Sequence, residues 1–223
     1  MNDLWWERES LVPFESPTSI FIVGVSGSGK SYLTRQILQH AGGMFKKPVV
    51  RILFCYGVWQ KLYTDMKREN SNIEFHQGFP SKEELFEWGS NEGHKILVLD
   101  DLMIDAADSM ETVHLFCVGS HHYNITVIHL MQNLFHKGKA MRTASLNCHY
   151  FILFPSYRDR LQIQTFGKQL YPGKSKYFMD AFDKATSKPY GYLLVDLSPH
   201  SDKSYQLRTD ILPGQVTTVF QPK

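Results

Sequence analysis

Residues 24–31 read Gly24-Val25-Ser26-Gly27-Ser28-Gly29-Lys30-Ser31 and match the pattern G-x-x-x-x-G-K-[ST] at every position. The run before them, 19–23, is short and apolar, and the run after them, 30–40, has Leu33 and Ile37 at helical spacing. Glycines let consecutive backbone N–H groups curl around phosphate oxygens without clashes from Cβ atoms. The pattern therefore predicts a strand, a phosphate-binding loop and a helix, in that order.

The residue types of this loop also predict how it would hold ATP. The N-terminus of the following helix adds the positive end of a dipole near the phosphates. We expect Lys30 to bridge the β and γ phosphates as a catalytic cation and the Ser31 hydroxyl to be a ligand of Mg²⁺. Tyr32 follows directly, so the predicted nucleotide-binding stretch is 24–32.

A second, acidic motif follows later in the chain. Residues 96–101, Ile-Leu-Val-Leu-Asp-Asp, form an apolar run that ends in two carboxylates, the first of them 70 residues after Lys30. We expect Asp100 to complete the Mg²⁺ site and Asp101 to be the catalytic group that polarises the attacking water. Which aspartate has which role stays open, and the alternative interpretation is a plain turn after a strand.

The next apolar run, 126–131, ends in Gln132. Ligands of open α/β sheets bind at the carboxyl ends of the strands, so Gln132 is predicted to sense the γ phosphate or to orient the water. The alternative is an amide that caps the next loop. Phosphoryl transfer also uses a cation opposite the γ phosphate, often from a neighbouring subunit. Arg142 is the first candidate for this catalytic arginine, and Arg158 and Arg160 are its rivals.

Apolar runs alternate with helical patterns along the chain, which favours an α/β fold: a P-loop NTPase with a mostly parallel central sheet flanked by helices on both faces. Residues 192–197 and 205–212 leave no room for a helix between them and predict a C-terminal antiparallel hairpin at one edge. Ser81 and Glu84 form a capping-box pattern at the start of one helix. We expect an N-terminal extension, 1–16, and a single ATPase domain, 17–223. Strands are predicted over 19–23, 49–56, 73–75, 95–99, 124–131 and 149–154, and helices over 30–40, 81–88, 109–118 and 158–170.

The charge is distributed unevenly along the 223 residues. Residues 60–112 hold 5 basic and 12 acidic side chains, a net charge of −7, whereas residues 133–188 hold 10 basic and 3 acidic ones, a net charge of +7. A basic segment neutralises phosphates without reading base sequence, so this second segment is the candidate surface for double-stranded DNA. The alternative is a solvated face.

The cysteines and the apolar runs of the sequence indicate the kind of cellular compartment in which the protein is expected. Cys55, Cys117 and Cys148 are scattered among apolar residues, which predicts buried free thiols in a reducing compartment. No apolar run approaches the ~20 residues that span a bilayer. The N-terminus is acidic and lacks the apolar segment of a signal peptide, so we expect a protein that is neither secreted nor bound to a membrane.

The order of these motifs resembles the viral genome-packaging ATPases of the FtsK–HerA superfamily, above all the poxvirus-type enzymes and those of Maverick/Polinton elements and their adintovirus-like kin. The resemblance covers about residues 17–215, and it is carried by 24–31, 100–101, 121–135, Arg142-Thr143, Leu146-Asn147 and 155–172. The phosphate loop is shared by very many NTPases, and the stretch 132–172 narrows the resemblance to this family. It implies an ATP-driven homo-oligomeric ring that pumps double-stranded DNA into a preformed capsid and contacts a capsid or portal-vertex protein. It also implies Gln132 as the polar sensor, an arginine acting in trans, and a location in the cytoplasm or nucleus of the infected host, or on the virion.

The chain departs from that family at one position and leaves two other functions open. Many members of the superfamily carry glutamate after the metal-binding aspartate, whereas Asp101 is one methylene shorter. The phosphate loop also resembles that of some small-molecule kinases, although Asp101 and Gln132 suit attack by water better than transfer to an acceptor. The remaining alternative is a capsid assembly factor that binds a nucleotide without working as a motor.

Overall fold

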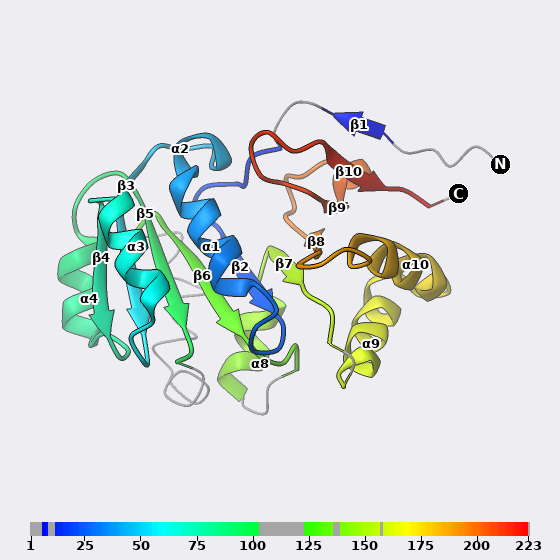
Figure 1. Cartoon of the computed structure of the whole chain (residues 1–223), viewed down its shortest axis with the longest axis horizontal. Coiled ribbons are helices and arrows are strands. Elements are labelled where there is room, and N and C mark those ends of the chain that lie inside the picture. Colours follow the sequence, from blue (N-terminus) through cyan, green and yellow to red (C-terminus); the bar gives the residue numbers. More distant parts are fainter. Residues whose placement is uncertain (1–5, 9–11, 103–122, 136–138, 157, 223) are drawn as a thin grey trace.

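The computed structural model describes residues 6–8, 12–102, 123–135, 139–156 and 158–222 (Figure 1). They form a ten-stranded sheet with helices packed on it. The strands are β1 (Trp6–Arg8), β2 (Ser19–Val23), β3 (Val49–Tyr56), β4 (Ile73–Gln77), β5 (His94–Asp100), β6 (Ile125–Met131), β7 (Tyr150–Leu153), β8 (Leu193–Asp196), β9 (Leu207–Thr209) and β10 (Thr217–Phe220). The α-helices are α1 (Lys30–Gln39), α2 (Ala41–Met44), α3 (Lys61–Glu69), α4 (Lys82–Gly89), α8 (Lys139–Leu146), α9 (Arg160–Leu170) and α10 (Ser175–Ala185).

The strand order is β1-β10-β9-β8-β7-β2-β6-β5-β3-β4. The six strands from β7 to β4 in this order are parallel, and β8, β9, β10 and β1 continue the sheet with antiparallel pairs. The predicted fold class is therefore confirmed, including the antiparallel hairpin, which corresponds to β8 and β9. The edge extends further than predicted, because β10 and the N-terminal strand β1 add to it.

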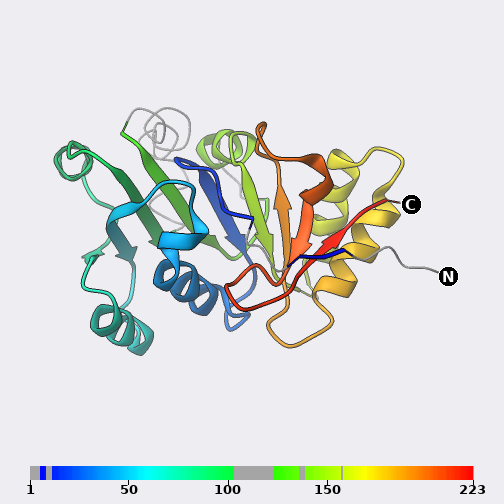
Figure 2. The same ribbon diagram turned by 90° about the horizontal axis from the view of Figure 1, so that it is seen from above.

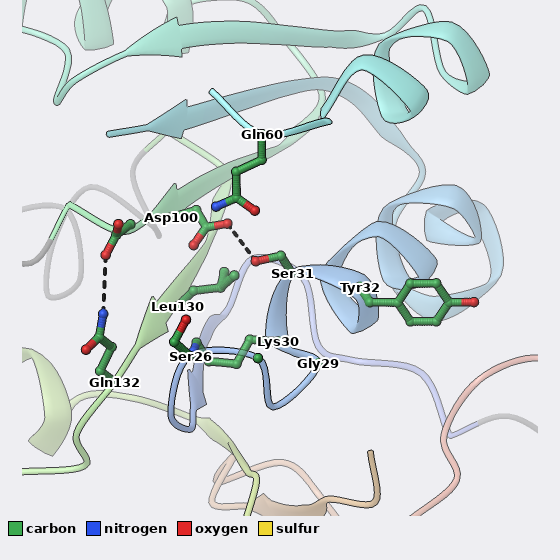
Figure 3. Close-up of a pocket in the computed structure, with 11 residues that line it drawn as sticks. Ser26, Gly29, Lys30, Ser31, Tyr32, Gln60, Asp100, Leu130 and Gln132 are labelled. Atoms are coloured by element: carbon green, nitrogen blue, oxygen red, sulfur yellow. Dashed lines mark hydrogen bonds between the residues drawn. The ribbon is translucent and has the colours of Figure 1, made fainter. Parts of the chain in front are cut away.

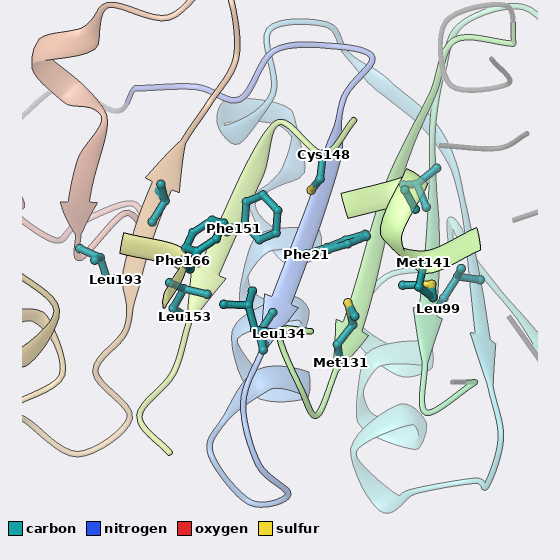
Figure 4. Close-up of a cluster of buried hydrophobic side chains, with 14 of the residues drawn as sticks. Phe21, Leu99, Met131, Leu134, Met141, Cys148, Phe151, Leu153, Phe166 and Leu193 are labelled. Atoms are coloured by element: carbon teal, nitrogen blue, oxygen red, sulfur yellow. The ribbon is translucent and has the colours of Figure 1, made fainter. Parts of the chain in front are cut away.

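Alternating side chains of the central strands fill two separate cores. On β2, Phe21 points into one core and Ile22 into the other. Helices α4, α8, α9 and α10 contribute to the first core, and α1, α2 and α3 contribute to the second (Figure 2). Figure 4 shows the first core, in which the rings of Phe21 and Phe151 meet edge-on with their centroids 5.6 Å apart. Burial on both faces explains why the central strands are continuously apolar.

Most local predictions agree with the observed elements. The predicted strands 19–23 and 49–56 coincide with β2 and β3, and the other predicted strands and described helices differ from the observed ones by one to three residues at their ends. The Ser81 hydroxyl accepts a hydrogen bond from the Glu84 N–H (3.2 Å), and the Glu84 carboxylate accepts one from the Ser81 N–H (2.7 Å), which completes the predicted capping box. The helix predicted over 109–118 lies outside the described residues. The sequence analysis did not predict α2, α3, α8 or α10.

Two of the three cysteines lie in the described residues. Cys55 and Cys148 are buried free thiols, as predicted, and Cys117 lies outside that part of the chain. Burial raises the pKa of both thiols to about 12, so neither is a reactive thiolate at neutral pH. None of the helices in the described ranges has the length and apolar character needed to cross a bilayer.

A buried ion pair joins the antiparallel strands. Arg208 on β9 donates from Nη1 to Oδ2 of Asp196 on β8 (2.9 Å) and to the Tyr205 carbonyl (2.7 Å), and both charged side chains are 1% exposed. The other carboxylate oxygen of Asp196 accepts the Ser198 N–H (3.1 Å). These bonds compensate two charges that burial would otherwise make costly.

The first prediction concerns this pair. Arg208→Met should lower the free energy of unfolding by about 3–5 kcal/mol, because it leaves the Asp196 carboxylate buried without its cation. Urea denaturation measures the loss, and Asp196→Leu combined with Arg208→Met should recover much of it. The control is Arg68→Met, since Arg68 is 74% exposed in its pair with Asp65 and exposed pairs contribute only about 0–1 kcal/mol. Equal losses in Arg208→Met and Arg68→Met would contradict the prediction.

Candidate nucleotide-binding site

At several positions of the loop between β2 and α1, only glycine fits the backbone conformation or the space available. Gly27 and Gly29 have φ angles of 77° and 106°, in the left-handed region. A Cβ atom on Gly24 would lie 2.6 Å from Oγ of Ser28 and 2.7 Å from Cβ of Phe154. Gly29 is the N-cap of α1 and makes no side-chain cap, so the N–H groups of the first helical turn face the loop with their dipole uncompensated. This is the backbone arrangement that binds phosphate.

Lys30 lies folded over its own loop. Its Nζ donates to the carbonyl oxygens of Gly24 (2.6 Å) and Val25 (3.0 Å). Burial lowers the pKa of Lys30, while the nearby carboxylates of Asp100 and Asp101 oppose that shift. The ammonium group is thus held beside the position where a phosphate would bind, on two carbonyls that it can exchange for phosphate oxygens.

Asp100 ends β5 and is only 4% exposed. Its Oδ2 accepts hydrogen bonds from the Ser31 hydroxyl (2.9 Å) and from the Tyr63 hydroxyl (2.9 Å). Burial raises the pKa of Asp100, and the two hydroxyl donors and the charge of Lys30 act against that rise. The carboxylate therefore connects the first turn of α1 to α3, across the end of the sheet.

Asp101 has a backbone φ of 58°, which is rare for a residue other than glycine. Successive side chains of a strand normally point to opposite faces, but this left-handed residue directs its carboxylate to the same pocket as Asp100. There Nε2 of Gln132, which directly follows β6, lies 3.5 Å from Oδ1 of Asp101, at the long limit of a hydrogen bond (Figure 3). The strand ends of β5 and β6 thus present an acid and an amide side by side.

These side chains line one pocket of about 270 Å³ at the carboxyl ends of the parallel strands. Figure 3 shows Gln132 at one end of the pocket and Tyr32 at the other, with Lys30 and Ser31 between them. The pocket brings together most of the predicted site residues. The lining residues are Ser26, Gly27, Gly29, Lys30, Ser31, Tyr32, Gln60, Asp100, Asp101, Leu130 and Gln132.

The predicted arginines do not line this pocket. Arg142 is exposed on α8, on the side of that helix away from the buried Met141 and Ala144. Arg158 is also exposed, whereas Arg160 forms a two-pronged ion pair with Asp183 on α10 (2.6 and 2.7 Å). None of the three candidate arginines therefore lines the pocket at the phosphate loop.

The sequence analysis missed two residues of the site: Gln60, which lines the pocket, and Tyr63, which lies behind it and binds Asp100. Gln60 lines the pocket and is the N-cap of α3, and Tyr63 lies one turn further along that helix. Tyr63 is fully buried, and its hydroxyl points at Asp100 from 37 residues away in the chain. An available signal was the aromatic run Tyr56, Trp59 and Tyr63, whose rings pack together just beyond β3.

The predicted Mg²⁺ site can be tested against the residues present. The described residues contain no cluster of three or more His, Cys, Asp or Glu placed to hold a metal ion. Mg²⁺ in phosphate sites, however, takes only one or two protein oxygens and completes its shell with phosphate and water. The Ser31 hydroxyl and the Asp100 carboxylate, 2.9 Å apart and facing the pocket, fit that role.

The sheet order and the loop define the fold as that of a P-loop NTPase. Comparison with solved structures gives the same class. The genome packaging NTPase B204 of Sulfolobus turreted icosahedral virus 2, solved in complex with ATP-gammaS, superposes with a TM-score of 0.58 at 12% identity, covering 92% of this chain and 98% of that one. B204 of Sulfolobus turreted icosahedral virus, described as a DNA-packaging ATPase, superposes with a TM-score of 0.55 at 14% identity, covering 93% and 98%.

The similarity to B204 spans nearly the whole of both chains. At these identities it establishes a shared fold. No protein-family model and no curated protein sequence matches the chain.

The second prediction concerns Tyr63. A double-mutant cycle with Tyr63→Phe, Asp100→Asn and both changes together should give a coupling free energy of about 1.5–3 kcal/mol, because the buried carboxylate loses a hydroxyl donor. Urea denaturation of the four proteins, without nucleotide, measures it. A coupling free energy near zero would show that the Tyr63 hydroxyl contributes nothing to holding the Asp100 carboxylate.

Proposed function

We propose that this protein is a Mg²⁺-dependent ATPase that moves double-stranded DNA into a preformed viral capsid. The observation that carries the proposal is the pocket in which the phosphate loop faces Asp100, Asp101 and Gln132, within a fold shared along almost its full length with genome packaging NTPases. The loop supports nucleotide binding, the two strand ends support hydrolysis, and the shared fold supports the coupling to DNA.

The residues of the pocket divide the hydrolysis step among themselves. Lys30 exchanges the carbonyls of its own loop for oxygens of the β and γ phosphates. Ser31 and Asp100 hold Mg²⁺, which when bound neutralises charge on those phosphates. Asp101 accepts a proton from a water molecule, and Gln132 orients that water for attack on the γ phosphorus. The bond from that phosphorus to the β–γ bridging oxygen breaks, giving ADP and phosphate.

The pairing of Asp101 with Gln132 favours hydrolysis over transfer to a bound acceptor. A kinase would use this end of the pocket for the hydroxyl of its substrate, whereas here an amide and a carboxylate lie 3.5 Å apart across it. Such a pair offers one small nucleophile a proton acceptor and a hydrogen-bond donor side by side. We therefore assign water as the phosphoryl acceptor.

The charge distribution supports a DNA-facing role for one end of the sheet. The acidic segment 60–112 supplies α3, β4, α4 and β5, and the basic segment 133–188 supplies α8, β7, α9 and α10. Helices α9 and α10 lie on the opposite side of β2 from α3, β4 and α4 (Figure 1). Exposed cations in the basic segment suit contacts with a phosphate backbone that do not depend on base sequence. They include Arg158, Lys168, Lys174 and Lys176.

A homo-oligomeric ring completes the proposal. Arg142 is exposed and absent from its own pocket, so it serves catalysis only by entering the pocket of the next subunit. Repeating that contact around a closed ring gives every pocket one such arginine. The ring acts inside the infected host cell, at a capsid or portal-vertex protein.

The third prediction tests hydrolysis. Asp101→Asn should bind ATP and Mg²⁺ normally but lower kcat by about 10²–10⁴-fold, because the attacking water loses its proton acceptor. Asp100→Asn should instead weaken binding of ATP in the presence of Mg²⁺. Phosphate release and calorimetric titration separate the two effects.

The controls for that experiment are Lys30→Ala and duplex DNA. Lys30→Ala should abolish hydrolysis and weaken ATP binding, and duplex DNA of any sequence should stimulate the wild-type enzyme. Wild-type rates in Lys30→Ala would refute the site. Turnover that is indifferent to DNA but dependent on a small phosphoryl acceptor would refute the DNA motor, and binding of ATP without turnover would leave only an assembly factor.

The fourth prediction places Arg142 in trans. Arg142→Ala should assemble and bind ATP yet lose about 10³–10⁵-fold in rate, the loss typical of an arginine finger. Mixing it in equal amounts with inactive Lys30→Ala should restore about a quarter of wild-type activity, because in a randomly mixed ring one interface in four joins an intact Lys30 to an intact Arg142. Steady-state hydrolysis measures both effects. Full activity of Arg142→Ala, or no rescue in rings shown to be mixed, would exclude Arg142 as the arginine that acts in trans. Arg158 would then be the next candidate to test.

A further inference from the structure

The turn between α10 and β8 carries an exposed tyrosine next to the phosphate loop. Tyr190 is 71% exposed, and a Cβ atom on Gly29 would lie 3.1 Å from its Cδ1. Resting on the proposed ATPase function, we propose that the ring of Tyr190 is the surface on which the base of the bound nucleotide stacks. The base site thus lies on the far side of the phosphate loop from Asp101 and Gln132.

The direction of the bound nucleotide follows from the pocket. The groups suited to water attack, Asp101 and Gln132, lie at one end, so the γ phosphate lies there. The rest of the nucleotide then extends past Lys30 and Ser31 to the end marked by Tyr32 (Figure 3). A base attached to that chain leaves the phosphate pocket next to Gly29.

The strand order places Tyr190 on the side of β2 away from Asp100 and Gln132. Asp100 and Gln132 follow β5 and β6, which lie on one side of β2, whereas β7 and β8 lie on the other side. Tyr190 lies just before β8 and touches the loop that follows β2. It is therefore on the nucleoside side of the phosphate loop.

The turn holds Tyr190 in place without a ligand. The Gly191 N–H donates to the Lys188 carbonyl (2.9 Å), and the Lys188 ammonium pairs with Asp210 (2.6 Å). A Cβ atom on Gly191 would lie 2.5 Å from the Ala185 carbonyl oxygen, so the chain passes tightly under the end of α10. These contacts fix the backbone on both sides of the tyrosine, which lowers the entropy cost of stacking a base on it.

The conformation of Tyr190 itself points the same way. Its φ is 60°, in the left-handed region that a bulky side chain occupies only at a cost. The ring gains no burial in return, since most of it faces solvent. An exposed aromatic face beside a phosphate loop suits a nucleobase, because stacking on an aromatic ring uses the π face that every base has.

The test compares a ligand that has a base with one that lacks it. Tyr190→Asn removes the ring and keeps a residue that tolerates left-handed φ. We expect it to weaken binding of ATP and ADP by about ten-fold or more, and to leave binding of inorganic tripolyphosphate within about two-fold of wild type. Tyr190→Trp should keep wild-type affinity for all three ligands. Isothermal titration calorimetry with Mg²⁺ measures the affinities, and thermal unfolding shows that each variant is folded.

Two further variants sharpen the result. Phe86→Ala removes another exposed aromatic ring, on α4 at the opposite end of the sheet, and should leave all affinities unchanged. Tyr32→Ala tests the rival aromatic at the same end of the pocket. Three results would overturn the assignment to Tyr190 and leave the ATPase proposal standing. Tyr190→Asn could keep wild-type affinity for ATP, or it could lose affinity for ATP and tripolyphosphate equally. The third result is a loss of affinity for ATP, but not for tripolyphosphate, in Tyr32→Ala alone. A wild-type chain that binds neither ATP nor tripolyphosphate would overturn both.

Discussion

The burial of the Asp100 carboxylate is the constraint around which the site is built. A carboxylate that is 4% exposed loses most of its hydration, and its pKa rises unless hydrogen bonds and opposite charge replace the water. Here the replacements come from Ser31 at the start of α1 and Tyr63 on α3, with Lys30 nearby. The Asp100 carboxylate thus links α1, β5 and α3 through hydrogen bonds that replace its lost hydration.

The parts of the fold and site predicted from the sequence are those encoded locally. The phosphate loop depends on glycines within eight residues, and the cap of α4 depends on Ser81 and Glu84, three residues apart. The central strands are buried on both faces, so their apolar runs are continuous and easily recognised. The meeting of Asp101 with Gln132 followed from a topological rule, because the carboxyl ends of parallel strands share one edge of a sheet.

The parts that the sequence did not reveal depend on contacts between distant residues. The Tyr63 hydroxyl reaches Asp100 only because α3 packs into the second core, and the sequence around Tyr63 gives no sign that its hydroxyl binds a carboxylate. Strand β1 exists through pairing with β10, about 210 residues away, and three residues carry no periodic signal of their own. Tyr190 approaches Gly29 only once β8 has joined the sheet beside β7.

The shorter acid at position 101 has a structural reason. Asp101 has a φ of 58°, so the chain turns sharply where β5 ends. A Cβ atom on Gly57 would lie only 3.0 Å from the Asp101 carbonyl oxygen, so this turn packs closely against the loop after β3. Aspartate occupies left-handed backbone more readily than glutamate, because its short polar side chain bonds locally. The same turn carries the carboxylate into the pocket, within 3.5 Å of Gln132, so the missing methylene is offset by the backbone. In this chain, therefore, the identity of the acid and the conformation of the strand end depend on each other, and a glutamate at position 101 would need a different turn to bring its carboxylate to the same place beside Gln132.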